Sequence, residues 1–146
     1  MANKYVSKKN KDFIRKLAHG CCEYCQSQEA YSTQNFSMEH IIPTHLDGSN
    51  EIDNLALSCQ GCNNIKFTKI GLTDETTDEF IPFFHPRQDI WIEHFKWNDD
   101  FTLIIPLTKK GEVTLKVLKM NREQVVNWRT AVLSVGKHPP LHTIVD

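Results

Sequence analysis

Apolar residues recur at helical spacing near the start of the chain. Phe13 and Ile14 each stand three or four positions before Leu17, as they would on the buried face of an amphipathic helix. Gly20 follows as a residue suited to a helix stop. The pattern predicts one short helix over residues 9–18 that leads into the first cysteines.

The following segments have the shorter period and the turn residues of β-structure. Residues 35–42 mix polar and apolar side chains and end before a proline, which is typical of a strand that runs into a loop. Residues 44–54 are polar and contain an Asp-Gly-Ser-Asn turn sequence, so we expect a functional loop there. A brief strand at residues 55–58 and a helix as far as about residue 70 complete the first half.

The second half has a different texture. Residues 101–108 and 112–120 show imperfect strand-like alternation on either side of a Lys-Lys-Gly turn, which predicts a β-hairpin. Asn121 is a suitable N-cap for a final helix that ends at Gly136.

The acidic, threonine-rich segment 73–79 is the expected boundary between the two halves. The order of elements predicts an α+β fold. We expect residues 1–72 to form the core and residues 73–146 to form a C-terminal extension, a hairpin plus a helix, that packs on the core.

Composition narrows the class of protein. The 146 residues are 40% hydrophobic, enough for one compact domain or a small core with a second element. The formal net charge is -1, so the chain lacks the basic excess of a protein that coats nucleic acid non-specifically. The most apolar run, residues 103–107, is too short to span a bilayer, and no apolar segment of a signal peptide follows the first lysines. We therefore expect a cytoplasmic protein.

Basic residues nevertheless crowd the N-terminal segment. Their run is compatible with a solvated surface and equally with a face that contacts phosphates. The residues are Lys4, Lys8, Lys9, Lys11, Arg15 and Lys16.

Four of the five cysteines form two matched pairs with the C-x2-C spacing of a zinc knuckle. Cys22 and Cys25 make one pair, and Cys59 and Cys62 make the other. Each knuckle can turn two thiolates toward one tetrahedral ion, and in a reducing compartment such pairs indicate metal rather than disulfides. A redox dithiol would need only one exposed pair with a lowered pKa. Cys21 could replace Cys22 as a ligand, but the matched spacing favours Cys22 and leaves Cys21 as a small buried apolar residue.

The chain between and just after the knuckles carries a combination of residues that is more specific than any one of them. Glu39-His40 and then Asn54, before the second strand, lie between the knuckles, and Asn63 and Lys66 follow the last cysteine. With its two C-x2-C pairs, this arrangement resembles the HNH endonuclease family over about residues 22–69. The resemblance implies a ββα-metal core. The three motif positions are then His40, Asn54 and Asn63, so the chain is a variant with asparagine in place of the final histidine.

The resemblance and the chemistry of the residues together assign expected roles. His40 is the expected general base, since a neutral imidazole accepts a proton near pH 7. Asn54 is expected to shape the loop that orients His40. Glu39 and Asn63 offer oxygen ligands that suit a catalytic Mg2+ or Mn2+ ion. Lys66 is a candidate phosphate contact, although a solvated helix lysine is the simpler interpretation.

These residues favour a metal-dependent endonuclease that hydrolyses phosphodiester bonds in DNA, with RNA left open as a substrate. His45 is expected to lie outside the active site. One alternative is a zinc-dependent nucleic-acid-binding module without catalysis, which leaves the presence of Glu39, His40, Asn54 and Asn63 unexplained. Another is a zinc-stapled interaction domain that uses the C-terminal part as its partner surface. The sequence does not indicate an oligomeric state or a nucleotide specificity.

Overall fold

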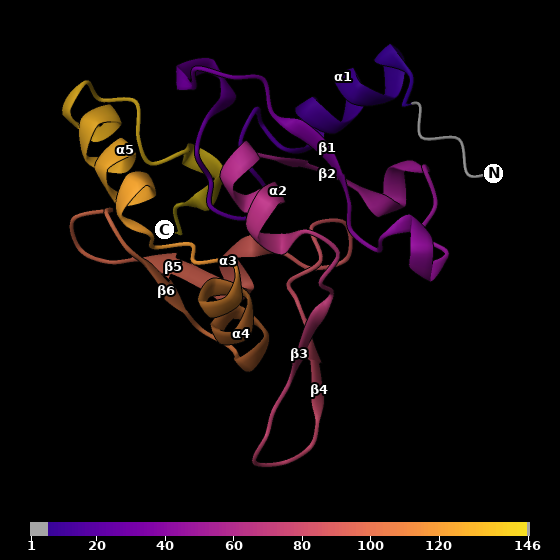
Figure 1. Cartoon of the computed structure of the whole chain (residues 1–146). Coiled ribbons are helices and arrows are strands. Elements are labelled where there is room, and N and C mark those ends of the chain that lie inside the picture. The colour runs from indigo at the N-terminus through magenta and orange to yellow at the C-terminus, as the bar shows by residue number, and fades with distance from the viewer. Residues whose placement is uncertain (1–5, 146) are drawn as a thin grey trace. The chain divides into compact units, whose positions relative to one another are not determined.

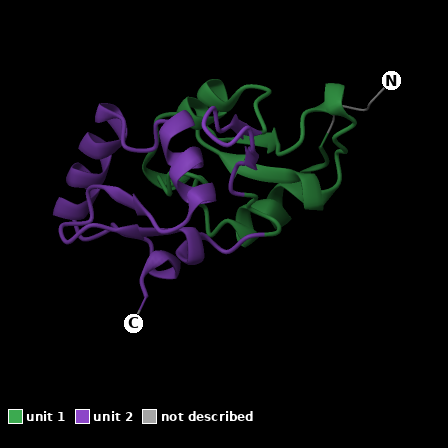
Figure 2. Cartoon of the chain, turned by 90° about the horizontal axis from the view of Figure 1, so that it is seen from below, with its two compact units in different colours: residues 1–70, 85–88 green, residues 71–84, 89–146 purple. Residues whose placement is uncertain are grey.

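The computed structural model describes residues 6–145, which divide into two compact units (Figure 2). Unit 1 comprises Met1–Ile70 together with His85–Gln88, and unit 2 comprises Gly71–Phe84 together with Asp89–Asp146. Helices and short antiparallel strand pairs occur in both units (Figure 1). The predicted α+β class is therefore confirmed.

Unit 1 is built from a helix, a two-stranded sheet and a second helix. Strands β1 (Ser37–His40) and β2 (Leu55–Ser58) are antiparallel, with His40 opposite Leu55. The sheet and helix α2 (Gln60–Lys66) form the ββα unit that the resemblance implied. Short 3-10 turns occupy Glu29–Tyr31, Thr44–Leu46 and Ile52–Asn54. The expected strand–loop–strand–helix order is confirmed.

Helix α1 (Lys8–Leu17) confirms the first prediction from the apolar spacing. The hydroxyl of Ser7 caps its first turn by accepting a hydrogen bond from the Asn10 amide at 3.2 Å. Ile14 is fully buried in the core of unit 1, whereas Phe13 and Leu17 stay exposed. One apolar side chain therefore anchors the helix to the core.

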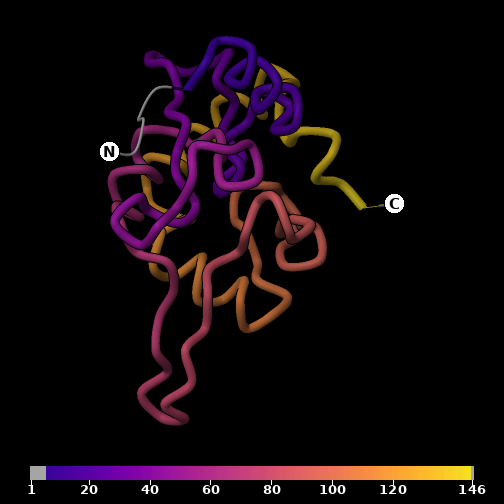
Figure 3. Tube along the Cα trace, turned by 90° about the vertical axis from the view of Figure 1, so that its right-hand side faces the viewer, coloured from indigo at the N-terminus to yellow at the C-terminus, as the bar shows by residue number. Residues whose placement is uncertain are grey.

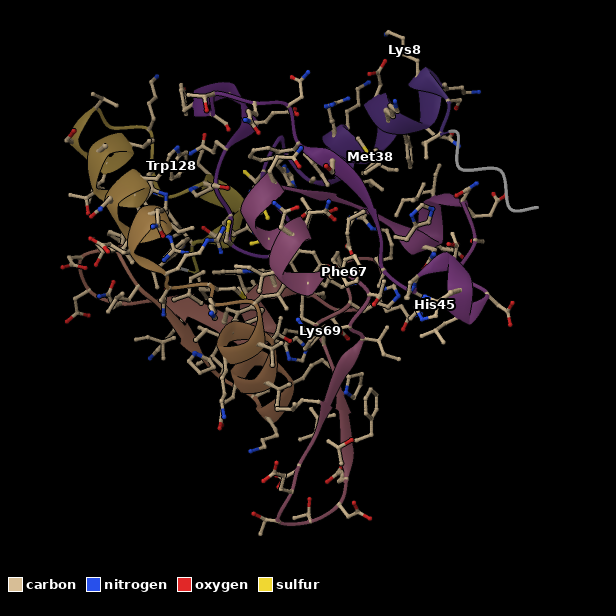
Figure 4. All side chains as sticks on the ribbon, in the orientation of Figure 1. Lys8, Met38, His45, Phe67, Lys69 and Trp128 are labelled. Atoms are coloured by element: carbon tan, nitrogen blue, oxygen red, sulfur yellow. The ribbon has the colours of Figure 1, made fainter. Side chains whose placement is uncertain are left out.

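Helix α2 ends earlier than the sequence predicted. Its first turn is capped by the Cys59 sulfur, which accepts a hydrogen bond from the Cys62 amide at 3.3 Å. The helix stops at Lys66 because Phe67 adopts a φ of 51°, outside the helical region. Phe67 is exposed beyond the last turn of α2 (Figure 4).

Unit 2 contains two hairpins and three helices. Its hairpins pair β3 (Gly71–Thr73) with β4 (Phe80–Pro82), and β5 (Phe95–Trp97) with β6 (Ile104–Pro106). The helices are α3 (Trp91–His94), α4 (Lys109–Val117) and α5 (Glu123–Ser134), and a 3-10 turn occupies Leu141–Thr143. The acidic segment that we expected at a domain boundary connects β3 to β4, at the tip of the extended hairpin in Figure 3.

The predicted hairpin at residues 101–108 and 112–120 is wrong in its second strand. Only β6 falls in the first segment, and β6 pairs with β5 instead. The second segment lies mostly in helix α4, because Thr108 accepts a hydrogen bond from the Gly111 amide at 3.0 Å and caps a helix there. Gly111 fits at this point because a Cβ would collide with the carbonyl oxygen of His94. The cap was not recognised in the sequence.

Asn121 was predicted to cap the last helix, but α5 begins at Glu123 after Arg122. The Asn121 side chain instead bonds to the backbone of Ile104. Its oxygen accepts from the Ile104 amide and its NH2 group donates to the Ile104 carbonyl, each at 2.8 Å. Its oxygen also accepts from Arg129 at 2.9 Å. Asn121 therefore joins β6 to α5 within unit 2, a tertiary role that takes precedence over local capping.

Candidate functional site

Four cysteine sulfurs gather in unit 1 where the two knuckles meet. The Sγ atoms of Cys22, Cys25, Cys59 and Cys62 all lie within 4.8 Å of one another. Cys25 and Cys59 are 3.7 Å apart, close to the roughly 3.8 Å between two sulfurs on a tetrahedral zinc ion with Zn–S bonds of about 2.3 Å. The donor set and its spacing therefore fit one zinc ion.

The position of its sulfur separates Cys21 from this cluster, since a raised pKa is common to Cys21, Cys22 and Cys62. Hydrogen bonds from the neighbouring thiols, that of Cys22 first, hold the pKa of Cys25 well below its usual value. Burial raises the pKa of Cys21 to about 12, and Cys21 is not among the clustered sulfurs. Cys21 is the spare, buried thiol that the matched spacing predicted.

The two residues inside the first knuckle tie it to the rest of unit 1. The carboxylate of Glu23 accepts a hydrogen bond from the Leu57 amide at 2.8 Å, and the Glu23 amide donates to the Leu57 carbonyl at 2.9 Å. The other carboxylate oxygen forms an ion pair with Arg87. This pair explains why residues 85–88 belong to unit 1 although they follow β4 in the chain.

The other residue inside the knuckle, Tyr24, begins a buried network. Its hydroxyl donates to Glu39 Oε2 at 2.8 Å, while Glu39 Oε1 forms an ion pair with Lys66. Glu39 and Lys66 are 4% and 1% exposed. The Lys66 ammonium also donates to the carbonyl oxygen of Ile41 at 3.0 Å and lies 3.4 Å from that of His40. Lys66 therefore anchors the chain on both sides of the end of β1.

This network bears on two expectations. Lys66 is not a solvated lysine, because its ammonium is buried against Glu39 and the backbone, and the same burial does not favour the predicted phosphate contact. Glu39 does not fit the role of a metal ligand here, since one oxygen pairs with a cation and the other accepts from Tyr24. Successive side chains of a strand point to opposite faces, so Glu39 can face the core while the next residue faces outward.

That next residue is His40, which is half-buried at the end of β1. Its Nε2 atom lies 2.6 Å from Oδ1 of Asn50. An amide oxygen only accepts, so Nε2 carries the proton in this bond, and in a neutral imidazole Nδ1 then keeps the lone pair. Asn50 thereby selects the tautomer in which His40 can accept a proton.

Asn54 binds the loop that connects His40 to Asn50. Its oxygen accepts from the Ile42 amide at 2.8 Å, and its NH2 group donates to the carbonyls of Ile42 at 3.0 Å and Ser49 at 2.8 Å. Gly48 lies so close to this contact that a Cβ there would collide with the Ile42 carbonyl. The buried Asn54 amide therefore closes the loop beneath His40.

Replacing Asn54 with alanine is expected to reduce the free energy of unfolding by about 1–3 kcal/mol, since the change removes the partner of buried backbone groups. The exposed Asp53→Ala variant is the matched control, with an expected change within about 0.5 kcal/mol. Urea unfolding followed by circular dichroism measures both. Equal midpoints for the two variants would show that Asn54 does not stabilise the loop.

The structure does not join Asn63 to the other predicted site residues. Asn63 is half-buried on α2, and no hydrogen bond of its side chain is found among residues 6–145. The only group of three or more His, Cys, Asp or Glu ligands in the described chain is the cysteine cluster. The sequence interpretation missed Tyr24 and Asn50, because a residue between knuckle cysteines and a turn asparagine have no distinctive spacing.

The arrangement, two short strands and a helix stapled by four cysteines, agrees with the comparisons with known proteins. Residues 22–69 match the family described as HNH endonuclease. The match confirms the predicted resemblance for this segment, and its first and last residues are the ones that the sequence predicted.

A curated relative with similarity beyond this segment is the Septu protein PtuA of Bacillus mycoides (strain KBAB4). The two sequences are 26% identical over 84% of this chain but only 20% of the relative. The chain thus spans about one fifth of the length of that relative. No solved structure matches the chain. Within residues 6–145, none of the helices has the length and apolar character needed to cross a membrane.

Proposed function

We propose that this chain is a metal-dependent endonuclease of the HNH type that hydrolyses phosphodiester bonds in DNA. The observation that carries the proposal is the pairing of His40 with Asn50 in a loop closed by Asn54. The match of residues 22–69 to HNH endonucleases supports the same reaction class. In this proposal the four cysteines hold a structural zinc ion.

The protein's own residues supply the proton acceptor. Nδ1 of His40 takes the proton of an attacking water molecule, because Nε2 is held by Asn50 at 2.6 Å. The Lys66 ammonium, bonded to the Ile41 carbonyl, and the Asn54 amide, bonded to Ile42, fix the backbone after His40. Two buried side chains therefore hold the two residues that follow His40, and this positions the base before the substrate binds.

A divalent ion at Glu39 and Asn63 remains part of the expectation drawn from the family, but Glu39 is occupied by Lys66 and Tyr24. The proposed requirement for Mg2+ or Mn2+ therefore rests on the HNH match and not on a ligand set in this structure. Omitting each metal from the assay below tests it directly.

Replacing His40 with alanine is expected to lower the rate of cleavage at least about a hundredfold, the usual minimum for a general base. The assay follows conversion of supercoiled plasmid to nicked and linear forms with Mg2+, with Mn2+ and with neither. Asn50→Ala should give a smaller decrease, because it frees the imidazole without removing it.

His45→Ala is the matched control, since His45 is an exposed histidine of the same loop. It should cut like the wild type. Binding of DNA without cleavage by any form, with the fold intact by circular dichroism, would contradict the proposal and favour the non-catalytic binding module.

A further inference from the structure

Helix α1 carries a stripe of two lysines and an exposed aromatic residue. Lys9, Phe13 and Lys16 stand at positions i, i+4 and i+7, so they share one face of the helix. The Phe13 side chain is 47% exposed and both lysines are exposed as well. A phenylalanine between two lysines on a helix surface is not explained by the core of unit 1.

The charges of the stripe are not compensated by the ion pairs of the described residues. Asp12 pairs with Lys8 at 2.9 Å, and Arg15 pairs with Glu29 at 2.9 Å. In the described part of the chain, Lys9 and Lys16 belong to no salt bridge. Lys8 itself extends from the start of the helix in Figure 4. The stripe therefore offers two cations to an anionic partner.

The stripe forms one wall of a pocket of about 540 Å³ within unit 1, a volume in the usual range for small-molecule sites. The pocket is lined by Lys9, Asn10, Asp12, Phe13, Lys16 and Ile52. Ile52 also lines the pocket, and it stands two residues from both Asn50 and Asn54. One lining residue of the pocket is therefore a near neighbour in sequence of the residues that hold the loop after His40.

We propose that this stripe and Ile52 bind single-stranded DNA, with one unpaired base stacked on Phe13 and the neighbouring phosphates on Lys9 and Lys16. The inference rests on the proposed nuclease function and names the form of DNA that the site takes. Lysines beside an exposed aromatic ring favour single strands, because a stacked base must leave its own helix to reach the ring. A duplex would contact the lysines but not the phenylalanine.

The test measures binding by the full chain that carries His40→Ala, so that the DNA stays intact. A labelled single-stranded oligonucleotide and its duplex are titrated by fluorescence anisotropy. Adding Phe13→Ala should weaken single-strand binding on the order of tenfold and leave duplex binding nearly unchanged. Adding Lys9→Gln and Lys16→Gln together should weaken both and reduce the dependence of the affinity on salt.

Matched controls come from unit 2. Phe80 is 48% exposed, so Phe80→Ala controls for loss of an exposed ring, and Lys96→Gln with Lys116→Gln controls for loss of two exposed lysines. Single-strand binding that is unchanged by Phe13→Ala, or equally weakened by Phe80→Ala, would overturn the inference. Cleavage is measured separately with the protein that retains His40. If that protein cleaves DNA but Phe13→Ala does not change single-strand binding, the proposed binding surface is wrong while the proposed nuclease function stands.

Discussion

Cys62→Ser is expected to leave unit 1 unfolded at room temperature. Cys62 is fully buried among the three other clustered sulfurs, and its loss removes one of four ligands. Structural zinc contributes on the order of 10 kcal/mol to the folded state, which is comparable to the whole stability of a typical domain. The predicted result is loss of zinc, measured by mass spectrometry, together with loss of the cooperative thermal transition of unit 1.

Cys21→Ser is the matched control for this experiment. Cys21 is also buried, but its sulfur lies outside the cluster and 3.5 Å from the His19 carbonyl, a bond that serine can make. We expect Cys21→Ser to keep its full zinc content and to lose only about 1 kcal/mol of unfolding free energy. One zinc per chain in Cys62→Ser, or none in the wild type, would refute the assignment of the cluster.

Lys66→Met is expected to reduce the free energy of unfolding by about 3–5 kcal/mol. The change leaves the buried Glu39 carboxylate without its cation and the Ile41 carbonyl without its donor. Removing one partner of a buried ion pair has this cost because the remaining charge stays desolvated. Guanidinium unfolding followed by circular dichroism measures the difference.

The loss of unfolding free energy in Lys66→Met should depend on pH in a defined direction. Burial raises the pKa of Glu39 above its usual 4.5, and the nearby Lys66 opposes that rise. Without Lys66 the pKa rises further, so the folded variant binds a proton more readily than the unfolded chain does. Its stability relative to the wild type should therefore be lowest above the raised pKa and should recover as the pH falls toward 4.5.

Two further variants make this prediction specific. Lys69→Met removes an exposed lysine three residues beyond Lys66 and should change the unfolding free energy by less than about 0.5 kcal/mol. Glu39→Gln added to Lys66→Met should restore part of the loss, because a neutral amide can still accept from Tyr24. Equal unfolding midpoints for Lys66→Met and Lys69→Met would exclude the buried pair as a stabilising contact.

Local patterns predicted unit 1 better than unit 2. In unit 1 the main elements have a local signal, such as the apolar spacing in α1 and the turn sequence between β1 and β2. In unit 2 the apolar residues around Val113 suited a strand or a helix equally. Two contacts decided between them. The Thr108 cap is local and was not recognised in the sequence, whereas the fit of Gly111 against the His94 carbonyl joins parts of the chain that are 17 positions apart. Periodicity alone does not resolve such short apolar segments.

The sequence by itself determined the cysteine cluster and the ββα order of elements around it. The spacing indicated the two knuckles, because a C-x2-C pair orients two thiolates through local backbone geometry. The ββα order was implied by the resemblance to HNH endonucleases. It also singled out His40 and Asn54, although their roles stay predictions.

Only the tertiary structure decided which way the remaining polar residues face. Glu39 and Lys66 are 27 positions apart in the chain, yet they meet in the core beside Tyr24. Their pairing makes an expected metal ligand and an expected phosphate contact into an internal support for the segment after His40. The physical reason is burial: a charged side chain enters a core only with its partner, and that partner is chosen by the fold.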